Sequence, residues 1–532
     1  MKILICDPIS PKGIALFKER PEFDVVVLDK RLPEAELLPV VADVDAIVVR
    51  SETKISKTVL DAAVKLKVVG RAGVGVDNVD VEYATTKGVI VMNTPGGNTL
   101  TTAELTFSMI LNLARKVPQA HATMVAGKWD RKSFQGVELF GKTLGVLGMG
   151  RIGGEVAKRA LAFGMKVVAY DPFLTEVRAK AMGVSVAADL DEVYGVADFI
   201  TVHMPVTEQT KGMLNTSAFA KMKPNVRIVN CARGEIIVEE DLLAALDSGK
   251  VAGAGLDVFA EEPLGAEHPF RKHAGVIMTP HLGASTKEAQ EKCGIEVAEV
   301  IAGYLLTGEV RNAVNMPYLD AKTYEQVKPY LNLGEKLGKL ISQLTTEQID
   351  RLHITYGGKA QELPNIDPVT RAVLQGFLSR NAVKDLNNIN VRSVASTLGL
   401  CVEEKRSNEP VTFNEWLHVQ AFHGETKVVS AGGTFFGSPN NPRIVRLFSQ
   451  TVEIVPNGVL MLLNNNDRPG IVGHVGTLLG KHKVNIANMS LGRDTIGGQA
   501  LTVLSLDSLP PQELLADLEK DPDISNVKVV NL

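Results

Sequence analysis

Three side chains that could carry out acid–base chemistry follow apolar runs in the middle of the sequence. Arg233 lies after VRIVN, Glu262 lies in LDVFAEEP and His281 lies in MTPHLGAST. A histidine can take a hydroxyl proton near neutral pH, and a neighbouring carboxylate orients it and stabilises its charged form. An arginine fork can hold a carboxylate by two parallel hydrogen bonds. The set suits hydride transfer from a 2-hydroxy acid, although each residue alone is more typical of a surface ion pair, a turn or a packed histidine.

A glycine-rich turn supplies the second chemical signal. Gly148, Gly150 and Gly153 form the pattern GxGxxG between the apolar run TLGVLG and the helical stretch EVAKRALAFG, and Asp171 follows 18 residues after Gly153. The glycines allow a tight turn, a close approach of a pyrophosphate and packing of helix on strand, while the helix N-terminus attracts the phosphates. Asp171 can accept hydrogen bonds from a ribose 2′-hydroxyl and would repel a 2′-phosphate. The pattern therefore predicts an NAD site rather than an NADP site.

Strands and helices must alternate to bring such residues to one edge of a sheet. In the first 300 residues, β-branched runs such as KILICD and DAIVVR alternate with helical stretches, which predicts an α/β fold with a parallel sheet. Ligands bind at the carboxyl ends of the strands in a sheet of this kind. After a long helical stretch that begins at Asn98 or Thr99, six runs predict a six-stranded dinucleotide-binding sheet. These runs are TLGVLG, KVVAYD, FITVH, VRIVN, GAGLDV and VIMTP.

The position of the glycine-rich turn predicts how the domains are nested. The turn begins near residue 148, after an earlier α/β unit, rather than at the N-terminus. We therefore predict a Rossmann-type NAD-binding domain over 96–281, inserted into a flavodoxin-like substrate-binding domain that is split between 1–95 and 282–312. A cleft between two domains is a common place for a small substrate.

Residues 313–532 carry no catalytic motif. The segment MPYLDAKTYEQVKPY contains two prolines and mixed charge, and it is interpreted as a linker or domain entry. An α+β domain is predicted over 318–454, where amphipathic stretches alternate with strands such as RLHITYGG and TKVVSAGGTFF. A compact βαββαβ domain is predicted over 457–532, with the turn DRPG after its first strand.

Composition excludes several classes of function. Of the 532 residues, 45% are hydrophobic and 22% are charged, and the net charge is −4, so neither disorder nor binding to nucleic acid or to a membrane is predicted. No apolar run approaches the roughly 20 residues that span a bilayer. The four cysteines are scattered, and the N-terminus begins with a strand pattern without a basic leader. We expect a cytoplasmic protein without a metal site.

Five segments together resemble the NAD-dependent D-2-hydroxyacid dehydrogenases: GRAGVGVDNVD, the GxGxxG segment, NCARGEIIVEEDL, LDVFAEEP and TPHLGAST. The resemblance spans residues 1 to about 310. It implies that Arg233, Glu262 and His281 are the catalytic set, with His281 as the general acid and base. It also implies a larger group of residues around NAD. That group is Val74, Gly148, Gly150, Arg151, Ile152, Gly153, Asp171, Met204, Cys231, Ala232, Arg233, Asp257, His281, Leu282, Gly283 and Ala284.

The substrate is expected to bind through further cations. Arg50 in VVRS and Arg71 in GRAG lie at predicted strand ends and suit a phosphate, although a surface ion pair is the alternative for Arg50. The resemblance implies that Asn98 lies near the substrate and that Arg233 holds its carboxylate. The chain looks most like the long-form members of the family, which oxidise (R)-3-phosphoglycerate to 3-phosphohydroxypyruvate in the first step of L-serine biosynthesis.

The C-terminal residues resemble the added domains of those long-form enzymes, an intervening domain and an ACT domain. In related ACT domains the effector is held at positions that correspond here to Asn465, Asp467 and Asn485, and L-serine is the expected effector. The alternative is an ACT domain that serves only assembly. In the intervening domain, Arg443 and Arg446 could meet an anion or could be solvated. The resemblance also implies a homo-oligomer, either a dimer through the cofactor domains or a tetramer.

Two other functions remain open from the sequence. One is a different D-2-hydroxyacid dehydrogenase, of the hydroxypyruvate, glyoxylate or lactate type, for which the two C-terminal domains are not expected. The other is a non-catalytic NAD-sensing scaffold, against which the three catalytic residues argue.

Overall fold

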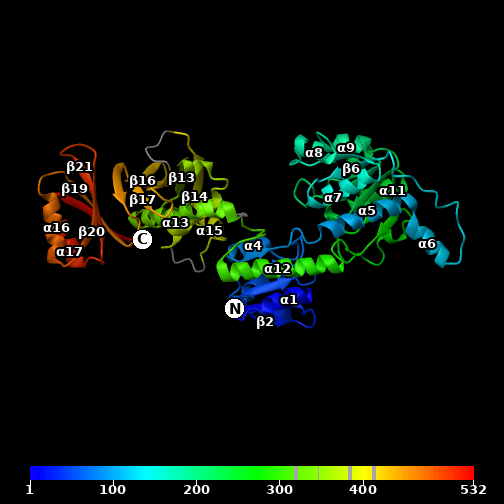
Figure 1. Ribbon diagram of the computed structural model, residues 1–532, viewed down its shortest axis with the longest axis horizontal. Coiled ribbons are helices and arrows are strands. Elements are labelled where there is room, and N and C mark those ends of the chain that lie inside the picture. Colours follow the sequence, from blue (N-terminus) through cyan, green and yellow to red (C-terminus); the bar gives the residue numbers. More distant parts are fainter. Residues whose placement is uncertain (317–320, 346, 381–385, 410–414) are drawn as a thin grey trace.

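The computed structural model describes residues 1–316, 321–345, 347–380, 386–409 and 415–532. Four sheets organise the chain, and Figure 1 shows them as four lobes along the long axis of the molecule. The first two sheets contain only parallel pairs, whereas the last two contain antiparallel pairs. The predicted fold class, an α/β protein with a Rossmann-type domain and a C-terminal ACT-like domain, is confirmed.

The first sheet is flavodoxin-like, with the strand order β2-β1-β3-β4-β5. Strands such as AIVV in β3 are buried throughout, because helices cover the sheet, and this accounts for their continuous apolar runs. The elements are β1 (Lys2–Ile5), α1 (Pro11–Lys18), β2 (Asp24–Val27), α2 (Glu34–Val41), β3 (Ala46–Val49), α3 (Lys57–Ala62), β4 (Val68–Arg71), α4 (Val81–Thr86) and β5 (Ile90–Met92).

The second sheet has seven strands, one more than predicted, in the order β12-β11-β10-β9-β6-β7-β8. The unpredicted strand is β8 (Ser185–Val186), whose two residues are too few to leave a periodic pattern in the sequence. The order reverses between β6 and β9, which is where dinucleotides bind in such sheets. The other elements are β6 (Thr143–Leu147), α7 (Arg151–Ala162), β7 (Lys166–Tyr170), α8 (Glu176–Met182), α9 (Leu190–Val196), β9 (Phe199–Val202), α10 (Thr216–Lys221), β10 (Val226–Asn230), η1 (Gly234–Ile236), α11 (Glu239–Asp247), β11 (Val251–Leu256), η2 (Pro269–Lys272) and β12 (Val276–Met278).

Long helices carry the chain between these two sheets. α5 (Thr99–Arg115) and the short α6 (Val117–Val125) precede the second sheet, and α12 (Lys287–Thr307) returns to the first one (Figure 1). A Cβ atom on Gly294 of α12 would lie only 2.6 Å from the Ser10 hydroxyl oxygen. Glycine at this position therefore lets α12 pack closely against the start of α1.

The third lobe begins with a helix where the sequence predicts a linker. α13 (Ala321–Leu344) contains Pro329 in its interior, and residues 317–320 of the predicted linker lie outside the described residues. A proline inside a helix costs roughly 3 kcal/mol. Apolar side chains such as Leu333 and Leu337 are fully buried along α13, and this tertiary packing outweighs the cost. From the first residue of α13 onward, the segment is therefore the entry to the third lobe, the second of the two interpretations, and not a linker.

The third sheet has six strands in the order β14-β13-β15-β16-β17-β18. The strand predictions for RLHITYGG and TKVVSAGGTFF are confirmed by β13 and β16. The elements are β13 (Arg351–Gly358), η3 (Lys359–Glu362), α14 (Asp367–Leu378), α15 (Val391–Thr397), β14 (Cys401–Arg406), β15 (Glu415–His423), β16 (Thr426–Phe435), β17 (Pro442–Leu447) and β18 (Gln450–Ile454).

The C-terminal lobe has the predicted βαββαβ order and a sheet of order β20-β21-β19-β22. One face of the sheet is covered by its two helices. Side chains of the other face, among them Leu460 and Leu501, belong to the same apolar core as Leu333 of the third lobe. The elements are β19 (Val459–Asn466), α16 (Ile471–Lys481), β20 (Ile486–Arg493), β21 (Gln499–Leu506), α17 (Gln512–Glu519) and β22 (Ile524–Asn531).

Three further findings concern the chemistry of the whole chain. The four cysteines are free. Within the described ranges, no helix is long and apolar enough to cross a bilayer. The same ranges contain no group of three His, Cys, Asp or Glu side chains that could hold a metal ion.

Candidate active site

The glycine-rich turn follows β6 at the point where the strand order of the second sheet reverses. Gly148 has a φ of 98°, which a residue with a side chain rarely adopts. A Cβ on Gly153 would lie 2.0 Å from the Gly148 carbonyl oxygen, so only glycine allows α7 to start this close to the strand. A Cβ on Gly150 would meet open space, which leaves the backbone at the N-terminus of α7 accessible. This cradle fits a pyrophosphate.

Asp171 lies at the end of β7, beside this turn. Its Oδ2 accepts a hydrogen bond from the backbone N–H of Met149 at 2.7 Å, and its Oδ1 accepts one from Phe173 at 2.8 Å. Arg178 on α8 donates to the Met149 carbonyl oxygen at 3.2 Å. The carboxylate is thereby held next to the glycine-rich turn, where a dinucleotide would place its ribose.

His281 and Glu262 form a direct pair. His281 Nδ1 lies 2.8 Å from Glu262 Oε2, and Glu262 Oε1 accepts a hydrogen bond from the backbone N–H of Phe259 at 3.1 Å. Because Nδ1 faces a carboxylate, Nδ1 carries a proton and Nε2 is left for a substrate. The hydrogen bond to Glu262 raises the pKa of His281 against the opposing effect of burial. Burial would raise the pKa of Glu262, but the contact with His281 outweighs burial, and the pKa of Glu262 is lowered.

Asp257 anchors the loop that carries His281. Its Oδ1 accepts hydrogen bonds from the Thr279 hydroxyl at 2.5 Å and the Leu282 N–H at 2.7 Å, and its Oδ2 accepts one from Gly283 at 2.8 Å. His281 itself has a φ of 53°, an uncommon conformation that these bonds hold in place. Asp257 is fully buried, so its carboxylate holds the loop from the protein interior.

Arg233 is placed by the turn after β10. Asn230 holds this turn: its Nδ2 donates to the Arg233 carbonyl oxygen at 2.8 Å, and its Oδ1 accepts from the Ala232 N–H at 3.0 Å. A Cβ on Gly234 would lie 1.9 Å from the Phe259 carbonyl carbon, so glycine brings the turn against the Glu262 loop. The Arg233 charge contributes to the lowered pKa of Glu262 and opposes a small part of the rise in the pKa of His281, so Arg233 lies near both. The structure thus brings the three predicted catalytic residues together.

The predicted substrate side of the cleft contains buried polar atoms without partners. Arg71 Nε, Thr94 Oγ1 and Asn98 Oδ1 form no hydrogen bond with the described chain. Leaving a buried polar group unpaired costs about 1–3 kcal/mol. Burial and the nearby charge of Arg233 lower the pKa of Arg71 to about 10. Such atoms are expected where a polar ligand completes the hydrogen bonds.

Arg50 sits on a turn that other side chains shape. The buried carboxylate of Asp7 accepts hydrogen bonds from the Arg50 N–H at 2.6 Å and the Thr53 hydroxyl at 2.5 Å. Asn78 Nδ2 donates to the Arg50 carbonyl oxygen at 2.8 Å. Arg50 directly follows β3, and Arg71 ends the neighbouring parallel strand β4, so both predicted phosphate ligands lie at the same edge of the first sheet.

The other residues expected around NAD take different positions. Met204 follows β9, and its Cγ would lie 3.1 Å from a Cβ on Gly148, so it borders the glycine-rich turn. Cys231 is buried with its Sγ 3.6 Å from Met109 Sδ, and burial raises its pKa to about 12. Val74 accepts a hydrogen bond from Asn93 through its carbonyl oxygen. Of the remaining residues in this group, Arg151 and Leu282 are exposed. The partly buried ones are Ile152, Ala232, Arg233 and Ala284.

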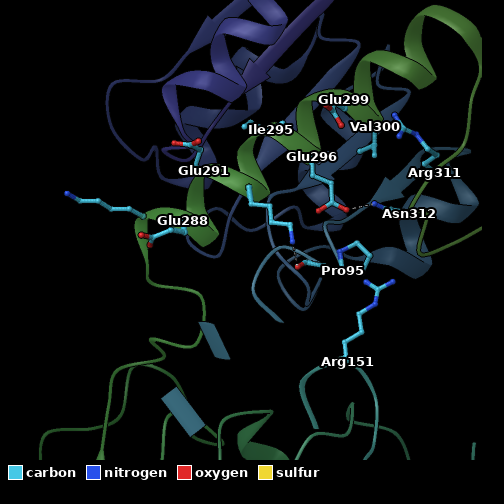
Figure 2. Close-up of a pocket in the computed structure, with 13 residues that line it drawn as sticks. Pro95, Arg151, Glu288, Glu291, Ile295, Glu296, Glu299, Val300, Arg311 and Asn312 are labelled. Carbon is cyan, nitrogen blue, oxygen red and sulfur yellow. Dashed lines mark hydrogen bonds between the residues drawn. The ribbon is translucent and has the colours of Figure 1, made fainter. Parts of the chain in front are cut away.

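A pocket of about 990 Å³ opens between α12 and the glycine-rich turn. Figure 2 shows Arg151 reaching toward Pro95 from one side and the acidic face of α12 on the other. Glu296 on α12 accepts a hydrogen bond from Asn312 Nδ2 at 2.9 Å, and Lys292 donates to the Gly96 carbonyl oxygen at 3.2 Å. The pocket borders the turn but not the three catalytic residues.

Sequence reasoning missed two residues of this cleft. Thr94 follows the end of β5, and Asp77, in the loop after β4, pairs with Arg233. Both lie just beyond the carboxyl end of a parallel strand, and that position alone could have drawn attention to them.

The residues predicted to bind an effector do not converge within the chain. The Asp467 N–H donates to the Gly498 carbonyl oxygen, whereas the Asp507 N–H donates to that of Asn485. Gly498 and Asp507 lie at opposite ends of β21, and at about 3.3 Å per residue their separation is roughly 25–30 Å. Asn465 is buried near the Asp467 end.

Each of these three side chains also forms a hydrogen bond within its own chain. Asn465 Oδ1 accepts from the Thr502 hydroxyl at 2.8 Å, and Asp467 Oδ2 accepts from Arg493 Nη1 at 2.7 Å. Asn485 Nδ2 donates to Asp507 Oδ2 at 2.7 Å. The remaining anion candidates, Arg443 and Arg446, lie over the rings of Phe436 and Trp416.

Three family models match the chain. The model of the D-isomer specific 2-hydroxyacid dehydrogenase NAD binding domain matches residues 107–283. The D-3-phosphoglycerate dehydrogenase intervening domain matches residues 326–448, and the ACT domain matches residues 459–523.

Whole-chain relatives and solved structures agree with these matches. D-3-phosphoglycerate dehydrogenase of Synechocystis sp. is 42% identical over 531 residues, which are 100% of this chain and 95% of that protein. The enzyme of that name from Methanocaldococcus jannaschii is 41% identical over 532 residues and is covered completely. The TT0316 protein of Thermus thermophilus covers 59% of this chain and is itself covered completely, with 36% identity and a TM-score of 0.55. NAD⁺-bound 3-phosphoglycerate dehydrogenase of Entamoeba histolytica covers 60% of this chain, and 99% of it is covered, with 29% identity and a TM-score of 0.51.

Proposed function

Because this chain belongs to the family of the D-3-phosphoglycerate dehydrogenases, we propose that it oxidises (R)-3-phosphoglycerate to 3-phosphohydroxypyruvate, with NAD as the hydride acceptor. The observation that carries the substrate is the cationic cleft. Arg71 is partly buried and its Nε is unpaired, and it lies close enough to Arg233 and Arg50 for both charges to lower its pKa. The activity is the entry step of L-serine biosynthesis.

His281 is the general base in this proposal. Its Nε2 takes the proton of the C2 hydroxyl, because Nδ1 faces Glu262 at 2.8 Å. Glu262 fixes the tautomer and stabilises the imidazolium that forms. Bound NAD supplies the acceptor for the C2 hydride. In the direction of reduction, the same histidine returns the proton.

Cations hold the two acidic ends of the substrate. We assign the carboxylate to Arg233 and the phosphate to Arg50 and Arg71, with Asn98 beside them. The unpaired Arg71 Nε and Asn98 Oδ1 support this assignment, since a phosphorylated hydroxy acid offers both acceptors and a donor. The glycine cradle and Asp171 support binding of NAD, with Asp171 disfavouring the 2′-phosphate of NADP.

The two rival functions fit less well. A dehydrogenase for glyoxylate, hydroxypyruvate or lactate would not need Arg71 as a buried cation, because its substrate has no phosphate. An NAD-sensing scaffold would not need the His281–Glu262 pair to be held by Asp257 and Phe259.

The effector site is proposed to form between two copies of the chain. Asp467 and Asn485 lie beside opposite ends of β21, so they cannot contact one ligand within a single chain. A second chain that brings its Asn485 to Asp467 would complete it, which requires a homo-oligomer, and L-serine is the proposed ligand. Exposed apolar side chains on and after α6, such as Val125 and Trp129, support a further contact between cofactor domains.

The test is an assay of NADH formation from (R)-3-phosphoglycerate by the full chain, with and without L-serine. We expect turnover that L-serine lowers. No NADH formation from this substrate would contradict the proposed reaction, and turnover unchanged by L-serine would contradict the effector proposal alone.

A further inference from the structure

An ion pair joins the first two lobes beside the catalytic residues. Arg233, from the turn after β10, donates a hydrogen bond from Nε to Asp77 Oδ2 at 3.0 Å, and its Nη2 lies 2.9 Å from the same oxygen in an ion pair. Asp77 belongs to the loop after β4 in the first lobe. The contact therefore spans the cleft in which the substrate is proposed to bind.

The loop that carries Asp77 lies directly against the guanidinium group. A Cβ on Gly75 would lie 1.8 Å from Arg233 Nη2 and 2.8 Å from Asp77 Oδ2. A side chain at this position would have to displace the guanidinium group from its present place. Glycine therefore lets the Arg233 side chain lie against the backbone of the loop, next to Asp77.

The recorded hydrogen bonds of Arg233 use only part of its donors. A guanidinium group has five N–H donors. Asp77 accepts one from Nε, and the Ala232 carbonyl oxygen accepts one from Nη1 at 2.6 Å, while Nη2 forms the ion pair with Asp77. Donors therefore remain on the terminal nitrogens. Two donors on neighbouring nitrogens match the two oxygens of a carboxylate.

Charge gives a second reason for an acid at this place. Arg233 and Arg50 both lower the pKa of Arg71, whereas Asp77 raises it. Asp77 therefore offsets part of the repulsion within the cationic cluster. The side chain of Asp77 is 73% exposed, whereas that of Arg233 is only 27% exposed. Asp77 therefore contacts the guanidinium group from the solvent side.

We propose that Asp77 is a positioning residue, which holds the Nε–Nη2 edge of Arg233 so that the terminal edge faces the carboxylate of the substrate. This inference rests on the proposed function only in that Arg233 binds a substrate carboxylate. Two other roles are physically possible for such a pair. Asp77 could compete with the substrate for Arg233, or the pair could be an exposed ion pair without effect.

Steady-state kinetics of three variants separate these roles. Asp77→Ala removes the acceptor, Asp77→Asn keeps an acceptor oxygen but removes the charge, and Glu82→Gln changes an exposed acid on the neighbouring helix α4 as the matched control. We expect Asp77→Ala to raise KM for the hydroxy acid about tenfold with kcat within about threefold and KM for NAD unchanged. Asp77→Asn should recover most of this loss, and Glu82→Gln should behave like the wild type.

The opposite outcomes overturn the proposal. A lower KM in Asp77→Ala would identify Asp77 as a competitor of the substrate, and an unchanged KM would identify a surface pair without effect. If Asp77 acts through Arg233, adding Asp77→Ala to Arg233→Ala should cause no further loss of kcat/KM. An additional tenfold loss in the double variant would place Asp77 in a separate role.

Failure of the substrate assignment can be told apart from failure of this inference. Asp77 acts on the carboxylate, which every 2-hydroxy acid carries. If the wild type oxidises an unphosphorylated acid such as D-glycerate instead of 3-phosphoglycerate, the same rise in KM is expected with that acid. Absence of the rise with whichever acid the wild type oxidises would refute the role of Asp77.

Discussion

The catalytic cleft and the ACT domain present two predicted ligand sites with opposite geometry. In the cleft, residues from separate strands meet in one chain, and Arg71 and Asn98 keep buried polar atoms without partners. In the ACT domain, Asp467 and Asn485 lie far apart, and each has a hydrogen-bond partner within the chain, Arg493 and Asp507 respectively. The cleft thus gathers unpaired polar atoms within one chain, as expected where a polar ligand completes the hydrogen bonds. The ACT domain of one chain does not gather its predicted residues, which is why we propose that a second chain contributes to its site.

The largest expected effect lies in the cleft and concerns the general base. His281→Ala should lower kcat for (R)-3-phosphoglycerate by about 10²–10⁴, the usual contribution of general acid–base catalysis. The control is His273→Ala, because His273 also faces an acid, Asp247, at 3.5 Å but precedes β12, at the end of the strand away from His281. Stopped-flow or steady-state NADH absorbance measures both. Near-normal turnover of the His281 variant would exclude the proposed base.

The second effect concerns the unpaired cation of the cleft. Arg71→Gln should lower kcat/KM for 3-phosphoglycerate about 10–100-fold, the value of a lost hydrogen bond to a charged group. The melting temperature of the free protein should stay equal or rise, because a partly buried cation with an unpaired Nε, repelled by Arg233 and Arg50, is removed.

The control for this variant is Arg227→Gln. Arg227 packs over the ring of Phe199, at 5.3 Å, and lies outside the cleft. We expect the reverse pattern there, a lower melting temperature with unchanged kcat/KM. A melting temperature that falls in Arg71→Gln without loss of activity would remove Arg71 from the site.

A smaller effect concerns the pH dependence. Contact with Glu262 raises the pKa of His281, and the base is active only when His281 is neutral. In the wild type, kcat/KM for oxidation therefore falls as the pH drops through this raised pKa. Glu262→Gln removes the negative charge, so the acidic limb should move to lower pH while kcat falls about tenfold from lost orientation. A limb that moves to higher pH would contradict the pairing.

The smallest effect on basal turnover is expected in the ACT domain. Asp467→Ala and Asn485→Ala should each leave kcat unchanged and abolish inhibition by L-serine. Co-expressed chains that carry one substitution each should regain part of the inhibition, because a hybrid pair rebuilds one site from two intact halves. If each variant is inhibited normally, the two residues do not bind the effector. If the hybrids stay insensitive, the site is not shared between chains.

Much of the cleft is predictable because strand ends of a parallel sheet converge. Arg233, Glu262 and His281 follow different strands, yet the parallel order of β10, β11 and β12 brings their ends to one edge. Thr94 and Asp77 escape prediction because neither threonine nor aspartate after a strand is distinctive by itself. Their significance depends on which side chains they meet.

The remaining differences have local causes. β8 has only two residues, which are too few to leave a pattern in the sequence. Pro329 is unfavourable inside a helix, so the sequence does not predict that α13 continues through it. The effector residues show a different limit. Their 18-residue spacing fits the family, but α16 lies between Asp467 and Asn485 and carries the chain to the other end of the sheet. The spacing of Asp467 and Asn485 along the sequence therefore does not show whether the two residues meet within one chain or between two chains.

A cleft built for a phosphorylated hydroxy acid must discriminate against the same acid without its phosphate. The direct measurement is the ratio of kcat/KM for (R)-3-phosphoglycerate to kcat/KM for D-glycerate in the wild-type chain. We predict a ratio of about 100 or more, because two cations lose their anion when the phosphate is absent. A ratio near one, or a preference for D-glycerate, would contradict the assignment of Arg50 and Arg71 to the phosphate.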